Sequence, residues 1–170
     1  MPAEIQILPI SEEHIKGFHA CLDAVAREGR YLSRIEAPPL EAVEKFVRDN
    51  IARDVAQLVA LDNGAVVGCC DVIPSGIDSF KHGGRLGMGV AKKYRGQGIG
   101  ERLARETIMK VKANGLERIE LSVFASNMAA RKLYEKLGFI VEGTKKRAVK
   151  FDGRYDDVIE MAMFLDAHME

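Results

Sequence analysis

The sequence predicts an α/β domain in which a mixed, mostly antiparallel central sheet is flanked by about four helices. Two observations carry this prediction. Strand-like and helix-like patterns of apolar residues follow one another in the order β-α-α-β-β-β-α-β-α-β-β. The chain has 170 residues, 47% of them hydrophobic, and no repeat, low-complexity tract or flexible linker divides it. We therefore expect one domain over residues 1–170.

The first third of the chain predicts one strand and two helices. Residues 5–10 follow the short alternating pattern of a strand. Ser11 can cap a helix that ends at Gly29, with an apolar face made by Ile15, Phe18, Leu22 and Val25. A second helix should begin near Pro38 and Pro39, with an apolar face made by Leu40, Val43, Val47 and Ile51. The mostly polar residues 30–36 then form a loop.

Turn residues and a change of period place the remaining elements. Asp62-Asn63-Gly64 separates two strands over 57–61 and 65–73, because Asn-Gly tolerates the positive φ of a tight hairpin. A strand over 85–90 precedes a helix that starts at Ile99 and ends at Asn114-Gly115. The last elements should be a buried strand over 118–124, a helix over 127–137 stopped by Gly138-Phe139, and a hairpin of residues 140–150 and 155–165.

The composition argues against several classes of partner. The 25 Lys and Arg residues balance the 25 Asp and Glu residues, so the formal net charge is 0. Proteins that coat nucleic acid or an anionic membrane usually need a strongly basic face. No apolar run approaches the ~20 residues of a membrane span, and the first residues lack the basic segment of a secretory signal. We expect a cytoplasmic protein with no nucleic-acid or membrane partner.

Charged residues are distributed unevenly along the chain. Residues 1–80 hold 7 basic and 13 acidic residues, whereas residues 81–170 hold 18 and 12. The two halves can therefore face different ligands, although both can equally be solvated surface.

Cys69 and Cys70 are adjacent in an apolar run, so their side chains should point to opposite faces of a strand. We expect reduced, structural thiols and no metal site.

The most informative segment lies between a predicted strand and a predicted helix. Three glycines, Gly96, Gly98 and Gly100, stand among several basic residues just before the helix. A loop that enters a helix N-terminus offers free N–H donors and the positive end of the helix dipole, which together bind phosphate oxygens. The ligand predicted from the residues is a di- or polyphosphate.

Two other glycine motifs do not fit this loop. An ATP-binding or GTP-binding loop needs Gly-Lys-Ser or Gly-Lys-Thr, but Gly100 is followed by Glu101-Arg102. A dinucleotide fingerprint counted from Gly96 and Gly98 wants a third glycine where Glu101 stands. A glycine turn that serves only packing is the remaining alternative.

The run Arg95-Gly96-Gln97-Gly98-Ile99-Gly100 resembles the R/Q-x-x-G-x-G/A signature of the GNAT N-acetyltransferase superfamily. Residues 127–139 are similar to a second characteristic segment of that superfamily, and the element order resembles its fold over essentially the whole chain. The resemblance implies an acetyltransferase that uses acetyl-CoA as co-substrate. It also implies a GNAT-like fold and, at family level, a homodimer.

The resemblance implies roles for particular residues. Main-chain groups around Met88, Gly89 and Val90 would hydrogen-bond the acetyl and pantetheine groups. The pyrophosphate would be held by Arg95, Gly96, Gln97, Gly98, Ile99 and Gly100. Asn127 would bond the pantetheine arm, and Tyr134 would lie beside the thioester sulfur. The residues alone leave alternatives, since Asn127 can be only a helix N-cap and Tyr134 a core aromatic.

The mechanism expected is direct attack of a primary amine on acetyl-CoA in a ternary complex, because no cysteine stands in a context that lowers its pKa. The strand before the loop contains no acid, so the candidate general bases are His82, Asp71, Glu36 and Asp156. Tyr31 and the acids Glu36, Glu41 and Glu44 are expected to wall the acceptor site, with a second acidic contribution from residues 152–157.

Other functions stay open at this point. The alternative from another class is a non-catalytic acyl-CoA-binding sensor or partner-binding module, and a third is a nucleotide-binding domain of another fold. A polyamine, an amino acid, an amino-containing antibiotic and a protein N-terminus are all possible acceptors.

Overall fold

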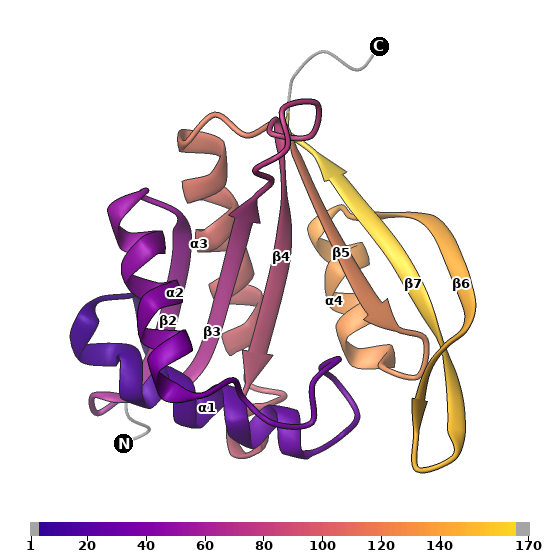
Figure 1. The fold of residues 1–170 in the computed structure, drawn as a ribbon, viewed down its shortest axis with the longest axis horizontal. Coiled ribbons are helices and arrows are strands. Elements are labelled where there is room, and N and C mark those ends of the chain that lie inside the picture. The colour runs from indigo at the N-terminus through magenta and orange to yellow at the C-terminus, as the bar shows by residue number, and fades with distance from the viewer. Residues whose placement is uncertain (1–3, 166–170) are drawn as a thin grey trace.

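The computed structural model describes residues 4–165, so residues 1–3 and 166–170 of the expected domain lie outside the described residues. A seven-stranded sheet runs in the order β1-β2-β3-β4-β5-β7-β6 (Figure 1). Only β4 and β5 pair in parallel; the other neighbours are antiparallel. The strands are β1 (Gln6–Pro9), β2 (Ala56–Asp62), β3 (Ala65–Pro74), β4 (Gly83–Val90), β5 (Arg118–Phe124), β6 (Ile140–Phe151) and β7 (Arg154–Phe164).

Four α-helices flank this sheet within residues 4–165, which confirms the predicted α/β class. They are α1 (Ile15–Arg27), α2 (Leu40–Ala52), α3 (Ile99–Ala113) and α4 (Met128–Leu137). Short 3₁₀ turns, η1 (Glu12–His14) and η2 (Lys92–Tyr94), precede α1 and α3. No helix among the described residues is both long and apolar enough to cross a membrane.

The helices cover opposite faces of the sheet. On one face, Val43 and Val47 of α2 and Phe18 of α1 pack with Cys69 of β3. On the other face, Leu103 of α3 and Tyr134 of α4 pack in the larger core with Cys70. Cys69 and Cys70 therefore point to opposite faces, as predicted, and both are buried free thiols. Ile51 was predicted on the apolar face of the second helix, but its side chain is 42% exposed, because the buried position in the last turn is taken by Asn50, which donates to Gln57 at 3.0 Å.

The hairpin turns follow their residue types. Asn63 and Gly64 both have positive φ, 49° and 83°, as do Asp152 and Gly153, at 48° and 76°. This is the geometry that a two-residue turn between twisted antiparallel strands requires. These turns set the register of β2 with β3 and of β6 with β7.

The pairing of the two parallel strands, β4 and β5, is incomplete, and the gap between them forms the site. β4 and β5 pair only at Gly83 with Arg118, Gly84 with Ile119 and Arg85 with Glu120. Beyond Arg85 the two strands diverge, as Figure 1 shows. The edge of β4 from residue 86 to residue 90 therefore faces β5 without a strand partner among the described residues. Apart from the Val90 carbonyl, which accepts from Arg95, the main-chain groups on that edge are available to a ligand.

Candidate active site

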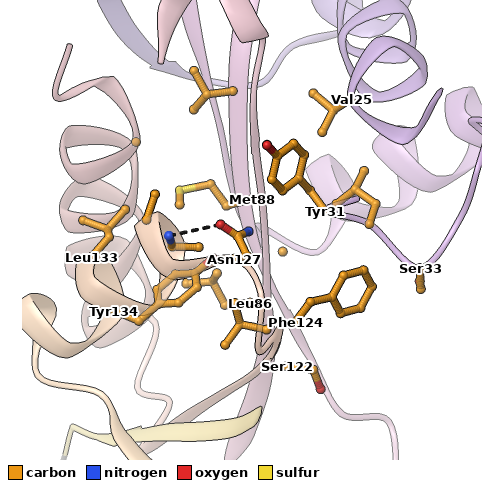
Figure 2. Close-up of a pocket in the computed structure, with 18 of the residues that line it drawn as sticks. Val25, Tyr31, Ser33, Leu86, Met88, Ser122, Phe124, Asn127, Leu133 and Tyr134 are labelled. Atoms are coloured by element: carbon orange, nitrogen blue, oxygen red, sulfur yellow. Dashed lines mark hydrogen bonds between the residues drawn. The ribbon is translucent and has the colours of Figure 1, made fainter. Parts of the chain in front are cut away.

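A cavity of about 780 Å³ occupies the gap between β4 and β5. Its size is that of an ordinary small-molecule site. β4 contributes residues 85–90, β5 contributes residues 122–124, and the loop after α1 contributes residues 31–33. Figure 2 shows Val25 and Tyr31 on one side of the cavity and Leu133 and Tyr134 on the other.

The glycine loop has a backbone conformation that residues with a side chain rarely adopt. Gly96 and Gly98 have φ of +72° and +79°, in the left-handed region, and Gly98 is the N-cap of α3. A Cβ built at either glycine meets no atom within 4 Å, so both face open space. The first helical hydrogen bond runs from the Arg102 N–H to the Gly98 carbonyl, which leaves the amides before it free to bind an anion.

Two other loop residues pack inside the protein. Ile99 is 3% exposed and belongs to the larger core. A Cβ at Gly100 would make ordinary contacts, 3.6 Å from Leu133 and 3.7 Å from Met88, so this position lies against α4 and β4. Gln97 does not line the cavity; its side-chain amide donates to the Lys93 carbonyl at 3.1 Å.

Arg95 lines the cavity, but its guanidinium is already engaged. It donates to both carboxylate oxygens of Glu28 at 2.8 and 2.6 Å, and its Nε donates to the Val90 carbonyl at 2.8 Å. The guanidinium also lies 4.7 Å from the centre of the Tyr31 ring. The hydrogen bonds from Arg95 lower the pKa of Glu28, so this pair is ionised at neutral pH. The main-chain N–H of Arg95 is engaged as well, because it donates to the Lys92 carbonyl at 3.3 Å.

The predicted β4 residues all line the cavity. Met88, Gly89 and Val90 follow the last paired position, Arg85, and so lie on the unpaired edge of the strand. The carbonyl of Val90 is already bonded to Arg95, so the acceptor group that it offers is in use. The contacts of this edge with a thioester and an amide-containing arm stay a prediction of the sequence.

Asn127 is placed for both of the roles considered for it, the helix N-cap and a ligand contact. Its Oδ1 accepts from the Ala130 N–H at 3.2 Å and caps α4, as the dashed line in Figure 2 shows. The residue also lines the cavity, and its side-chain NH₂ group is not used by this cap. The cap therefore orients the amide that a ligand could accept from.

Tyr134 is at once a core residue and a cavity residue. Its side chain is 7% exposed, and its ring packs edge-on to Phe139 with the ring centres 5.7 Å apart. Burial, and to a smaller extent the nearby Cys70, raises the pKa of Tyr134 above its ordinary value. The hydroxyl therefore stays protonated at neutral pH and can act as a hydrogen-bond donor.

Sequence reasoning missed a charged cluster on the β5 and β7 side of the cavity. Ser122 donates to Glu160 at 2.8 Å, and Lys145 pairs with Glu160 at 2.8 Å. Arg85 contacts Glu160 at 3.9 Å and hydrogen-bonds Ser122. Burial opposes ionisation of Glu160, but the Lys145 and Ser122 hydrogen bonds lower its pKa overall. Only strand pairing brings these four residues together, so no local motif could have found them.

The acidic wall expected from the N-terminal half is not what lines the cavity. Tyr31, Leu32 and Ser33 do line it. Glu36 instead pairs with Arg27 at 3.7 Å, and Glu44 pairs with Arg48 at 3.7 Å. The lining on the acceptor side therefore carries both signs of charge, from Arg85, Lys145 and Glu160.

The four candidate bases lie in different surroundings. His82 is exposed and stands just before β4, at the closed end of the β4–β5 pair. Asp156 accepts from the Ser126 hydroxyl at 2.6 Å and orders the turn after β5. Glu36 has a 67% exposed side chain. Asp71 and Asp156 are both half-buried and opposite a cavity residue, Gly87 and Val149 respectively, but the Asp156 carboxylate is already engaged by Ser126.

Comparisons with known proteins agree with this geometry. A model of the acetyltransferase (GNAT) family matches residues 22–139. The L-amino acid N-acetyltransferase AaaT of Escherichia coli K12 is 36% identical over 110 residues, which are 64% of this chain and 67% of AaaT. Matches to further curated N-acetyltransferases cover less than two thirds of those proteins.

Solved structures share the fold. A GNAT-family acetyltransferase from Streptococcus pneumoniae has a TM-score of 0.89 and 28% identity, and the match covers 95% of this chain and 99% of that one. The yncA protein of Salmonella typhimurium, solved with its cofactor acetyl-CoA, has a TM-score of 0.91 and 18% identity, with 99% and 98% covered.

The family model spans more than half of the chain, so the protein belongs to the GNAT acetyltransferase family. It is therefore an acyltransferase, as the two sequence motifs implied.

Proposed function

We propose that this protein transfers the acetyl group of acetyl-CoA to a primary amine by direct attack in a ternary complex. The single observation that carries the proposal is the gap between β4 and β5, because an unpaired strand edge and a glycine loop open onto one cavity. The edge suits the amide-rich pantetheine arm, and the loop suits the pyrophosphate.

The chain's own residues would bind and orient the thioester. Main-chain groups at Met88, Gly89 and Val90 hold the acetyl and pantetheine groups, and the amides at the start of α3 hold the pyrophosphate. A main-chain N–H on this edge meets the charge that develops on the carbonyl oxygen. The Asn127 side-chain NH₂ group donates to the pantetheine arm, since its oxygen already caps α4.

Tyr134 would act on the leaving sulfur. The thiol of CoA has a pKa near that of free Cys, about 8.5, so a thiolate leaves when the C–S bond breaks. A buried tyrosine that stays protonated can donate a hydrogen bond to that thiolate. Its low exposure also keeps water from competing for the same position.

Direct attack is favoured because the three cysteines are buried outside the cavity lining. Cys69 and Cys70 have raised pKa values, the first through Cys21 and burial, the second through burial to about 12. A thiol in that condition is a poor nucleophile. The pKa of Cys21 is instead lowered, chiefly by its hydrogen bond with Cys69, so the expectation that no cysteine has a lowered pKa is wrong for this residue. Cys21 is nevertheless buried outside the cavity lining, so an acetyl-cysteine enzyme is not expected.

L-amino acids are the acceptor class to test first. The curated relative AaaT is named for them. The charged cluster also offers Arg85 and Lys145 for a carboxylate and Glu160 for an ammonium group. A cytoplasmic location and a homodimer stay predictions of the sequence.

The experiment is an amine panel with purified protein. Release of CoA thiol would be followed with L-amino acids, a polyamine, an amino-containing antibiotic and a peptide with a free N-terminus. Amine-dependent release, with the N-acetyl product found by mass spectrometry in equal amount, supports the proposal. Tight acetyl-CoA binding without any amine-dependent release would instead support the non-catalytic binding module.

A further inference from the structure

One carboxylate lies where the neighbouring strand has no side chain. Asp71 of β3 is directly opposite Gly87 of β4. A Cβ built at Gly87 would stand 3.3 Å from Asp71 Oδ1, and no other atom lies within 4 Å of it. The carboxylate of Asp71 thus reaches over β4 into the space that a side chain at residue 87 would need. Gly87 itself lines the cavity.

The alternation of β3 shows which face this carboxylate occupies. Cys70 and Val72 point into the core beneath α3, so Asp71 shares the other face with Cys69. On β4, the same face carries Arg85, which belongs to the charged cluster, and Gly89, whose Cβ would lie 3.7 Å from Val25. Arg85 and Val25 both line the cavity. Asp71 therefore stands on the side of β4 from which an acceptor would approach.

The surroundings of Asp71 are polar but poor in charge. Across β2, Gln57 is opposite Asp71 and is 2% exposed, and its Nε2 has no hydrogen-bond partner within residues 4–165. The other ionisable groups near this face are Cys21 on α1, Cys69 on β3, Arg85 on β4 and Tyr31 in the loop, whereas the neighbouring Cys70 points to the opposite face. α2 contributes Val43, Val47 and Asn50 as its buried residues.

We propose that Asp71 accepts the proton that the acceptor ammonium must lose before it attacks the thioester, across the gap that Gly87 leaves in β4. This inference rests on the proposed acetyl transfer to a primary amine. It assigns the base to β3, because the part of β4 that borders the cavity contains no acid. Burial raises the pKa of Asp71 to about 7, which makes this carboxylate a far stronger base than an exposed aspartate.

The protons and bonds balance as follows. An alkylammonium group, with a pKa near 10.4, gives one proton to Asp71 and becomes a nucleophilic amine. The nitrogen lone pair forms the N–C bond, and the C–S bond breaks with its electron pair on sulfur. The nitrogen loses a second proton as the amide forms, and one proton reaches the sulfur to give the CoA thiol. Asp71 returns its proton to solvent, so one proton is released in each turnover.

The first test compares Asp71→Asn with wild type across pH 5–10. In wild type, kcat/KM for the amine should rise as pH rises through about 7, because Asp71 is then ionised. In Asp71→Asn that inflection should disappear, and kcat should fall by about 10²-fold while acetyl-CoA affinity changes little. Asp78→Asn is the matched control, since Asp78 is fully exposed in the loop before β4.

The second test moves the carboxylate. Gly87→Ala, with Asp71 present, should lower kcat because the new Cβ would displace Oδ1. Asp71→Ala combined with Gly87→Asp should regain at least tenfold of the activity that Asp71→Ala loses, because the acid then stands on β4 itself. A merely structural Asp71 would not be rescued in this way and would leave the pH inflection in place.

The outcomes separate this inference from the proposed function. If wild type acetylates an amine but Asp71→Asn keeps its kcat and its pH profile, the role of Asp71 is overturned and acetyl transfer stands. Should wild type release no CoA with any amine, both are overturned. If Asp71→Asn fails to fold, Gly87→Ala and the double variant decide: unchanged kcat in Gly87→Ala, or no rescue in the double variant, overturns the role of Asp71.

Discussion

The two sides of the cavity are built in different ways. On one side, β4 and the loop before α3 present main-chain groups and glycines, with Gly96 and Gly98 in the left-handed region. On the other side, the acceptor face presents side chains from β4, β5, β6 and β7, which meet only through strand pairing. A site made of main chain is insensitive to most side-chain changes. A site made of side chains can change its ligand with one substitution.

Arg95 connects these two sides. It belongs to the glycine loop, yet its guanidinium binds Glu28 and stacks on Tyr31, both in the segment after α1. This segment also provides Leu32 and Ser33 to the cavity. The contact therefore fixes the wall of the acceptor side against the loop that would bind the pyrophosphate.

The largest effect is expected on the main-chain side of the cavity, where substitution of Gly98 should weaken CoA binding. Gly98→Val should weaken CoA binding by about 10³-fold, because a φ of +79° is strained for valine and the side chain would stand among the amides that bind phosphate. Calorimetric titration with CoA measures this. Gly76→Val is the control, since Gly76 is in open space with an ordinary φ. Unchanged affinity in a folded Gly98→Val protein would overturn the binding site.

Tyr134 lies between the two sides and tests chemistry apart from binding. Tyr134→Phe should lower kcat by about 10²-fold with little change in CoA affinity, because the hydroxyl acts on charge that develops only as the thioester breaks. Steady-state kinetics together with CoA titration measure the two effects. Tyr155→Phe, at an exposed tyrosine of β7, is the control. Wild-type turnover in Tyr134→Phe would leave Tyr134 with its core role alone.

Loss of the contact between Arg95 and Glu28, which connects the two sides, should have a smaller effect. Glu28→Gln should raise the acceptor KM by about fivefold to tenfold, because it loses the charge-assisted hydrogen bonds that anchor residues 31–33 through Arg95. Varying the acceptor concentration at saturating acetyl-CoA measures this. Glu106→Gln, on the exposed face of α3, is the control. An equal effect in both variants would contradict a specific role for this contact.

The last effect concerns stability rather than activity. The folded pKa of Asp71, about 7, lies above the ordinary 3.8, so the native state binds more protons than the unfolded state between these values. The free energy of unfolding should therefore fall as pH rises from about 4 to about 7. Above pH 7, Asp71→Asn should be more stable than wild type, on the order of 2 kcal/mol.

Urea unfolding at pH 5 and pH 8 measures this difference. Asp78→Asn should show the same pH dependence as wild type, because its carboxylate is fully exposed. Equal stability of Asp71→Asn and wild type at pH 8 would contradict the raised pKa. A stabilised Asp71→Asn variant that has lost activity would show that a carboxylate needed for activity lowers the stability of the protein.

Local sequence determined the elements and the main-chain side of the cavity. Tight turns such as Asn63-Gly64 need residues that tolerate positive φ, and the spacing of apolar residues sets helices and strands, so both are encoded over a few positions. The glycine loop before α3 belongs to this class, because its left-handed backbone and its place at a helix N-terminus follow from adjacent residues.

Tertiary structure alone decided the acceptor side. Ser122, Lys145 and Glu160 lie far apart in the sequence, and only the order and register of β5, β7 and β6 bring them together. The partner of Arg95, Glu28, is 67 residues away, which no local pattern reveals. Asp71 was one of four candidate bases, and only register shows that its carboxylate lies opposite Gly87, where β4 has no side chain. Contacts between distant residues depend on how strands pair, and strand pairing is a property of the whole sheet.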